Sequence, residues 1–196
     1  MKFILGKKIS MTQIFKEDEV VPATIIEAGP CFVTQIKNKE NDNYEAIQIG
    51  FKKLKDKKVK RSMKGKEFRY LKEFTGDVSK YKIGDEIKAD VFAVGDKLKI
   101  SGVSKGLGFQ GVVKRHHFHG APKTHGTKHA LRSPGSIGAT APQRVFKGMR
   151  MAGRMGGERV SIKNLEIIEI QPEKNLLIIK GAVPGARNGL LEIRSL

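Results

Sequence analysis

One long segment that is almost free of acidic side chains constrains this chain more than any other feature. Residues 99–164 hold 13 Lys or Arg residues against one carboxylate, Glu158, together with all five histidines and 12 of the 22 glycines. Only three residues of this segment are aromatic. Such a composition cannot bury enough apolar surface to form an ordinary core, and its like charges repel one another. A strongly anionic partner is therefore needed to complete its structure.

The net charge of +18 is distributed unevenly along the 196 residues. Residues 52–72 carry 11 basic and two acidic residues, so this segment and residues 99–164 together account for the whole positive excess. A charge of this size favours nucleic acid or an anionic membrane surface as the partner. No apolar run reaches the length of about 18 residues that a membrane span requires, and the N-terminus does not have the pattern of a signal peptide. We therefore expect a cytoplasmic, soluble protein.

The rest of the sequence predicts a mainly β fold. Short β-branched or aromatic runs, separated by Gly, Pro, Asn and Asp, occur at residues 3–5, 20–27, 31–37, 44–51, 159–170, 175–180 and 190–194. Short strands in quick succession favour a barrel. We predict a small closed β-barrel body, formed by residues 1–98 and 160–196, with a long irregular basic extension, residues 99–159, inserted between strands.

Two segments leave alternatives open. The basic loop at residues 52–66 is either a solvated, mobile loop or a second arm that contacts phosphates and becomes ordered on binding. Residues 68–74 (FRYLKEF) fit a short strand and a helical turn equally well.

Gly106, Gly108 and Gly111 match the G-x-G-x-x-G pattern of dinucleotide-binding folds. Such a fold needs an acidic residue about 20 positions further on to hold the ribose hydroxyls. No acid occurs between Asp96 and Glu158, so the pattern does not indicate a dinucleotide site. Glycines nevertheless let backbone N–H groups approach phosphates closely, and a short helix is expected to begin at Val112, with an N-terminus that favours anions.

The clustered histidines admit three interpretations. Zinc usually takes four ligands that often include Cys, but the single cysteine, Cys31, is distant in sequence and the surroundings are cationic. We therefore predict no metal site and no cofactor. The histidines either stack on bases and bind phosphate or 2′-hydroxyl groups, as expected for RNA, or are solvated loop residues.

The Lys and Arg residues of 99–159 follow no helical or strand period. Irregular cations on a backbone rich in Gly and Pro suit a folded RNA better than the major groove of DNA. The residues that we predict to contact RNA are Lys105, Gly106, Gly108, Lys114, Arg115, His117, His119, Lys123, His125, Lys128, Arg132, Arg144, Lys147, Arg150, Arg154 and Arg159.

The sequence does not predict an enzyme. The segment 99–159 has no carboxylate pair, no Cys-His pair and no acid to orient a histidine, so we predict no catalytic residue and no small-molecule substrate. Two other functions are weighed against a structural RNA-binding protein. A regulator or RNA chaperone would bind RNA transiently, and an RNA-modifying enzyme would need a substrate pocket and a cofactor motif.

Several motifs resemble the universal ribosomal protein L-three family of the large subunit, in its bacterial form. The matching stretches, which together cover nearly the whole chain in order, are LGKKISMTQIF, GVSKGLGFQGVVKRHHF, RSPGSIG, RVFKGMRMAGRMG, NLEIIEI and NLLIIKGAVPG. Two positions depart from the family pattern: Leu107 stands where a basic residue is usual, and Lys99 where Asp or Asn is usual.

The resemblance implies a β-barrel body on the surface of the large ribosomal subunit and an arm buried in 23S-type rRNA. It implies that the arm runs toward the peptidyl transferase centre, that the protein nucleates early subunit assembly, and that neighbouring large-subunit proteins contact it. Some bacterial members carry a methylated glutamine between the SIG and VFKG elements. The corresponding stretch, ATAPQR, is one residue shorter, and Gln143 is its only glutamine.

Overall fold

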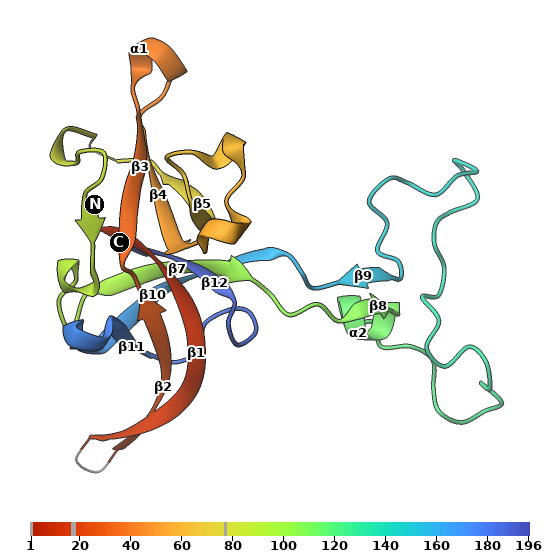
Figure 1. Cartoon of the computed structure of the whole chain (residues 1–196). Helices are drawn as coiled ribbons and strands as arrows, with labels where there is room; N and C mark the ends of the chain where they lie inside the picture. Colours follow the sequence, from red (N-terminus) through yellow and green to blue (C-terminus); the bar gives the residue numbers. More distant parts are fainter. Residues whose placement is uncertain (1, 17–18, 77) are drawn as a thin grey trace. The chain divides into compact units, whose positions relative to one another are not determined.

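The computed structural model describes residues 2–16, 19–76 and 78–196, and it is mainly β (Figure 1). The chain divides into two compact units. The first unit consists of Met1–Ser104 and Arg159–Leu196, and the second unit consists of Lys105–Glu158. The expectation of a mainly β fold is confirmed.

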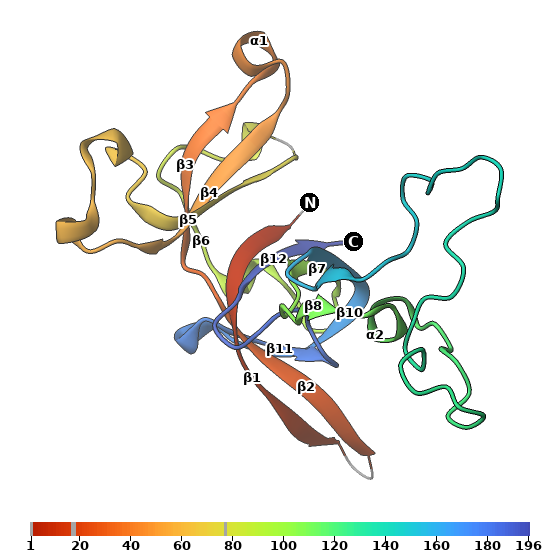
Figure 2. The same ribbon diagram turned by 90° about the vertical axis from the view of Figure 1, so that its right-hand side faces the viewer.

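Six antiparallel strands of the first unit form a sheet that closes into a ring. Their order around the ring is β1 (Phe3–Lys16), β12 (Leu190–Ser195), β7 (Lys97–Val103), β10 (Arg159–Gln171), β11 (Leu176–Lys180) and β2 (Glu19–Ala28), which pairs again with β1. In Figure 2, β1, β12, β7, β10 and β11 follow one another around this ring. Each strand contributes buried aliphatic side chains to one core, among them Leu5, Ile26, Ile100, Ile167, Ile179 and Ile193. This burial is the main source of stability for the first unit.

A second antiparallel sheet of the first unit shares the same core. Its strand order is β5 (Phe68–Phe74), β4 (Ala46–Lys53), β3 (Cys31–Lys37) and β6 (Glu86–Ile87), and the short helix α1 (Lys39–Asp42) lies at the far end of the β3–β4 hairpin (Figure 1). The ring of Phe3 stacks on that of Phe74, with centroids 4.8 Å apart. The Cys31 thiol donates to the carbonyl oxygen of Leu5 at 3.4 Å, and burial raises the pKa of this thiol to about 12. The two sheets are thus packed as one body.

The remaining elements of the first unit are short turns of 3₁₀-helix. They are η1 (Asp56–Lys58), η2 (Arg61–Met63), η3 (Val78–Lys80), η4 (Ala89–Val91) and η5 (Pro172–Lys174). Across the described ranges, the chain forms no helix with the length and apolar character that a membrane crossing requires.

The structure decides one open alternative and moves one boundary. Residues 68–74 form strand β5, because Tyr70 and Phe74 pair with Phe51 and Ile47 of β4. Residues 99–103 belong to β7, where Ile100 and Gly102 are buried, and Val103 pairs with Arg159 at the start of β10. The division between the two units therefore falls at Lys105 and Glu158 rather than at residues 99 and 159.

Candidate nucleic-acid interface

The second unit is organised by one short ladder between its two ends. Strand β8 (Gly108–Gln110) pairs with β9 (Gly153–Met155) in antiparallel register, Phe109 lying opposite Arg154. The backbone N–H of Leu107 extends the ladder by donating to the Met155 carbonyl at 2.9 Å. The five-residue helix α2 (Val112–His116) follows at once, as predicted from the run that begins at Val112. A helix of about one turn has only a small dipole, so its N-terminus contributes little to anion binding. Individual backbone N–H groups and cationic side chains must provide most of the attraction for an anion.

Arg115 connects α2 to the returning strand. Its Nη1 donates to the Met151 carbonyl at 2.7 Å, and the His116 ring Nε2 lies 3.2 Å from the same oxygen. A Cβ at position 153 would meet this Arg115 nitrogen at 2.7 Å, so Gly153 leaves the space that the guanidinium occupies. Arg115 therefore holds the fold of the second unit in addition to carrying charge.

A second close contact lies further along the unit, between Gly120 and Leu131. The Ala121 N–H donates to the Leu131 carbonyl at 3.0 Å, and a Cβ at position 120 would lie 2.4 Å from that oxygen. Gly120 also has a φ of +73°, which favours glycine. Residues 121–131 thereby form a closed loop that holds Lys123, His125 and Lys128.

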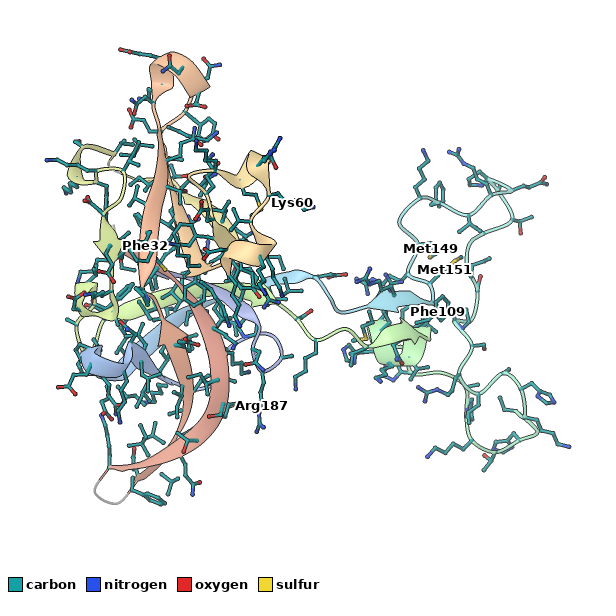
Figure 3. The ribbon with its side chains drawn as sticks, viewed as in Figure 1. Phe32, Lys60, Phe109, Met149, Met151 and Arg187 are labelled. Carbon is teal, nitrogen blue, oxygen red and sulfur yellow. The ribbon has the colours of Figure 1, made fainter. Side chains whose placement is uncertain are left out.

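The second unit buries almost nothing. Within the described residues 105–158, Val112 is the only buried side chain, at 3 % exposure. Every residue from Arg132 to Ala152 is exposed. Large apolar side chains are exposed as well: Leu107, Phe109, Ile137, Val145, Phe146, Met149 and Met151. Figure 3 labels three of them, Phe109, Met149 and Met151. Such a surface needs a partner that covers apolar groups as well as charge.

Most of the predicted RNA-contacting cations are exposed and unpaired in this unit. No carboxylate of the described residues lies within ion-pair distance of Lys105, Lys114, Lys123, Lys128, Arg132, Arg144, Lys147, Arg150 or Arg154, and all nine are exposed. The Arg144 guanidinium lies over the Phe146 ring, 5.8 Å from its centroid. This pair presents a cationic group and an aromatic surface together, which is a common combination in RNA recognition.

The predicted glycines and histidines lie on exposed backbone. Gly106 precedes β8, and Gly108 is its first residue, with a φ of +70°. His117 ends α2 in the left-handed region at a φ of 59°, and His125 has a φ of 58°. His119 is exposed, as is Gln143. Among the residues that the structure describes, no three His, Cys, Asp or Glu side chains lie close enough together to hold a metal ion.

Arg159 differs from the other predicted site residues because it belongs to the first unit. Its guanidinium hydrogen-bonds to Glu192, which also lies 3.4 Å from Lys72 Nζ. Partial burial raises the pKa of Glu192, but the hydrogen bond and charge of Arg159 and the charge of Lys72 outweigh burial and lower it. Arg159 is therefore partly neutralised by its own chain.

One candidate contact was absent from the prediction. Phe109 is 77 % exposed in β8, the largest exposed fraction among the large apolar residues of the described chain. The signal in the sequence was a phenylalanine between glycines in an acid-free segment, and an aromatic side chain left uncovered there is suited to stacking on a base.

The sequence is similar to those of known proteins over nearly its full length. The sequence model of the family described as Ribosomal protein L3 matches residues 73–175. A protein of Carboxydothermus hydrogenoformans, named Large ribosomal subunit protein uL3, is 51 % identical over 98 % of this chain and 96 % of its own length. Proteins of the same name from Herpetosiphon aurantiacus and Acidothermus cellulolyticus are 49 % and 46 % identical, over 97 % and 100 % of this chain and 94 % and 92 % of their own lengths. Because this similarity extends over nearly the full length of this chain and of each relative, the chain belongs to the ribosomal protein L3 family.

Proposed function

We propose that this chain is a structural constituent of the large ribosomal subunit and that its second unit is embedded in large-subunit rRNA. The observation that carries the proposal is the second unit itself, where nine exposed cations without a carboxylate partner and seven exposed large apolar side chains stand on a backbone with one buried residue. RNA supplies phosphates for the first group of side chains and base and sugar surfaces for the second.

The proposed mechanism is electrostatic and steric. Lys and Arg side chains neutralise phosphates as RNA helices pack together, and Arg adds bidentate contacts that Lys cannot make. The β8–β9 ladder and the Arg115–Met151 hydrogen bond preorganise one part of the unit. The exposed run from Arg132 to Ala152 follows the shape of the RNA around it, because no core of its own constrains it. The predicted contacts from Lys105 to Arg154 lie in this unit, and Arg159 contributes from β10.

The same proposal extends to the cellular role. The ring of six strands corresponds to the barrel body of the family, and the second unit, Lys105–Glu158, corresponds to its rRNA-penetrating extension. The partners are 23S-type rRNA and neighbouring large-subunit proteins, in cytoplasmic ribosomes. The protein nucleates early subunit assembly, its extension approaches the peptidyl transferase centre, and Gln143 is the candidate for modification. No enzymatic activity belongs to this role.

Sedimentation tests the proposal against a transient RNA chaperone. A tagged copy of the chain, expressed in place of the native protein, is expected to co-sediment with large subunits at one copy per particle and to remain bound after a wash in 0.5 M salt. A chaperone would instead sediment near the top of the gradient or leave the particle in the wash. That result would overturn the structural role.

A further inference from the structure

We propose a second RNA-binding surface on the first unit: the basic loop at residues 52–66, which binds the phosphates of an RNA duplex from outside. The inference rests on the proposed function for its partner class, but it concerns a different unit and a different mode of contact. The second unit is proposed to be enclosed by RNA, whereas this loop is proposed to contact the outer surface of an RNA duplex.

The basic loop is anchored to the second sheet at its base. The Leu54 N–H donates to the Glu67 carbonyl at 2.8 Å and closes the loop. Lys66 donates its Nζ to the side chain of Gln35 in β3. The Phe68 ring stacks on Phe32, with centroids 5.6 Å apart, in space that exists because Gly50 has no side chain. These contacts hold the loop on β3 and β4.

Hydrogen bonds within the backbone give the loop a shape of its own. Lys58 N–H donates to the Lys55 carbonyl at 2.8 Å within η1, and Met63 N–H donates to the Lys60 carbonyl at 2.9 Å in η2. The loop also surrounds an open hollow of about 450 Å³, which is lined by Val59, Lys60, Arg61, Lys64 and Glu67. The cations therefore stand on a folded support, which reduces the entropy lost on binding.

The charge of the loop has no counterpart in its own chain. It contains nine Lys or Arg residues against one acid, Asp56. Eight of the nine cations are exposed, and none of these eight lies within ion-pair distance of a carboxylate in the part of the chain that the structure describes. Figure 3 shows the Lys60 side chain at the outer edge of the loop. An anionic partner would gain from each of these charges.

The side chains around the cations point to a duplex rather than to unpaired bases. Between residues 52 and 67 there is no aromatic residue, and none of the exposed large apolar side chains of the described chain lies there. Single-stranded RNA is bound by aromatic stacking platforms, which this loop does not offer. A protein interface would also need apolar anchors at its centre. Phosphates on the outside of a duplex need neither.

The balance between lysine and arginine supports the same distinction. The loop has eight lysines and one arginine, whereas the second unit has five of each. Lysine is a compact, strongly hydrated charge suited to contacts that stay wet, and arginine suits contacts that lose water. The loop is therefore built for a solvated surface contact that is independent of sequence.

The experiment uses the full chain and two variants that each remove four charges. The loop variant carries K57Q, K58Q, K60Q and R61Q. The control variant carries K82Q, K97Q, K174Q and K180Q, four exposed lysines of the first unit without ion pairs in the described chain. Fluorescence anisotropy measures binding to a blunt 20-base-pair RNA duplex and to a 20-nucleotide oligo(U) between 50 and 200 mM salt. Thermal melting checks that both variants are folded.

The loop variant is expected to bind the duplex more weakly and with a smaller salt dependence. By the estimate for duplex DNA, the slope of log K against log salt falls by about 0.9 for each phosphate that the protein no longer neutralises, so by up to about 3.6 for four phosphates. The control is expected to change the slope by less than one, and the reduction in affinity for oligo(U) is expected to be smaller than for the duplex. Equal slopes for the two variants, or equal reductions on the two probes, would overturn the proposal. In the sedimentation experiment, failure of the chain to join large subunits would overturn the proposed function. The comparison of RNA binding between the loop variant and the control variant would still test the basic loop.

Discussion

Gly156 lies directly against the backbone of Lys105: a Cβ at position 156 would meet the Lys105 carbonyl oxygen at 2.1 Å. Gly156 also has a φ of +73°, in the left-handed region. Real Cβ atoms do not approach a backbone oxygen so closely, so the two chain segments that begin and end the second unit can meet only with glycine here. This contact lies just beyond the β8–β9 ladder, which ends where Gly108 pairs with Met155.

Gly156→Ala is therefore expected to open the base of the second unit. Limited proteolysis should cut residues 105–158 faster than in the parent chain, while the melting temperature of the first unit stays the same. Gly148→Ala is the matched control, because Gly148 has a φ of +83° but no atom within 4 Å of its Cβ position. The control carries only the strain of positive φ, about 1–2 kcal/mol. Equal cleavage of the two variants would show that the Lys105 contact does not matter.

A comparison of variants at Arg115 and at its neighbour Lys114 can distinguish the structural role of Arg115 from the effect of its charge. Each change, Arg115→Gln or Lys114→Gln, removes one positive charge, but only Arg115 donates to the Met151 carbonyl, at 2.7 Å. Loss of such a charge-assisted hydrogen bond costs about 1–3 kcal/mol. We expect hydrogen exchange of the β8–β9 amides to accelerate by about ten-fold or more in Arg115→Gln and to stay within two-fold in Lys114→Gln. Similar acceleration in both would assign the effect to charge alone.

Glu192 should make the stability of the first unit depend on pH. Its pKa is lowered below the ordinary value of 4.5 because Arg159 and Lys72 outweigh its partial burial. The ionised carboxylate therefore stabilises the fold fully above about pH 5, and this stabilisation is lost as the pH falls through the folded-state pKa. Glu192→Gln is expected to cost about 1 kcal/mol at pH 7 and almost nothing at pH 3.

Denaturant unfolding at several pH values measures this difference. Glu45→Gln is the control, since Glu45 and Lys39 form an exposed pair at 3.7 Å that should contribute little. A constant difference between the parent chain and Glu192→Gln from pH 7 to pH 3 would contradict the assignment.

Deleting residues 123–141 should separate folding from assembly. These residues lie in the second unit and include no buried side chain of the described chain. The deletion is expected to leave the circular dichroism and melting of the first unit unchanged and to reduce incorporation into large subunits on sucrose gradients. Loss of the β fold would show that this segment supports the core.

The strands were predictable where local pattern and tertiary contacts agree. Cys31–Lys37 forms β3 with the predicted bounds, because its run is β-branched and flanked by turns. FRYLKEF could not be assigned, since pairing with β4 decides its conformation. Lys8 shows the limit most clearly. A lysine predicts surface, yet Lys8 is only 8 % exposed and its Nζ donates to the Val183 carbonyl at 2.9 Å, a contact 175 residues away in sequence.

The candidate site was predictable as a composition but not as a set of roles. The absence of acid between Asp96 and Glu158 is visible in the sequence, and it identifies the segment. The same composition cannot distinguish Arg115, which hydrogen-bonds to Met151, from Arg150, which is exposed and unpaired within the described chain. Nor can it show that Arg159 pairs with Glu192 on another strand. Roles depend on neighbours that only the fold brings together.

The single buried side chain of the second unit, within its described residues, has a calorimetric consequence. Unfolding enthalpy follows the surface that a chain buries, at about 0.7 kcal/mol per residue near 60 °C. The free protein should therefore absorb about 100 kcal/mol on melting, as expected for the roughly 140 residues of the first unit, rather than the roughly 140 kcal/mol expected for the whole chain. A substitution that removes one of the proposed RNA contacts in residues 105–158 is therefore expected to leave the melting curve unchanged. A thermal-shift screen of variants of this protein therefore reports the stability of the first unit and does not report the proposed RNA contacts of the second unit.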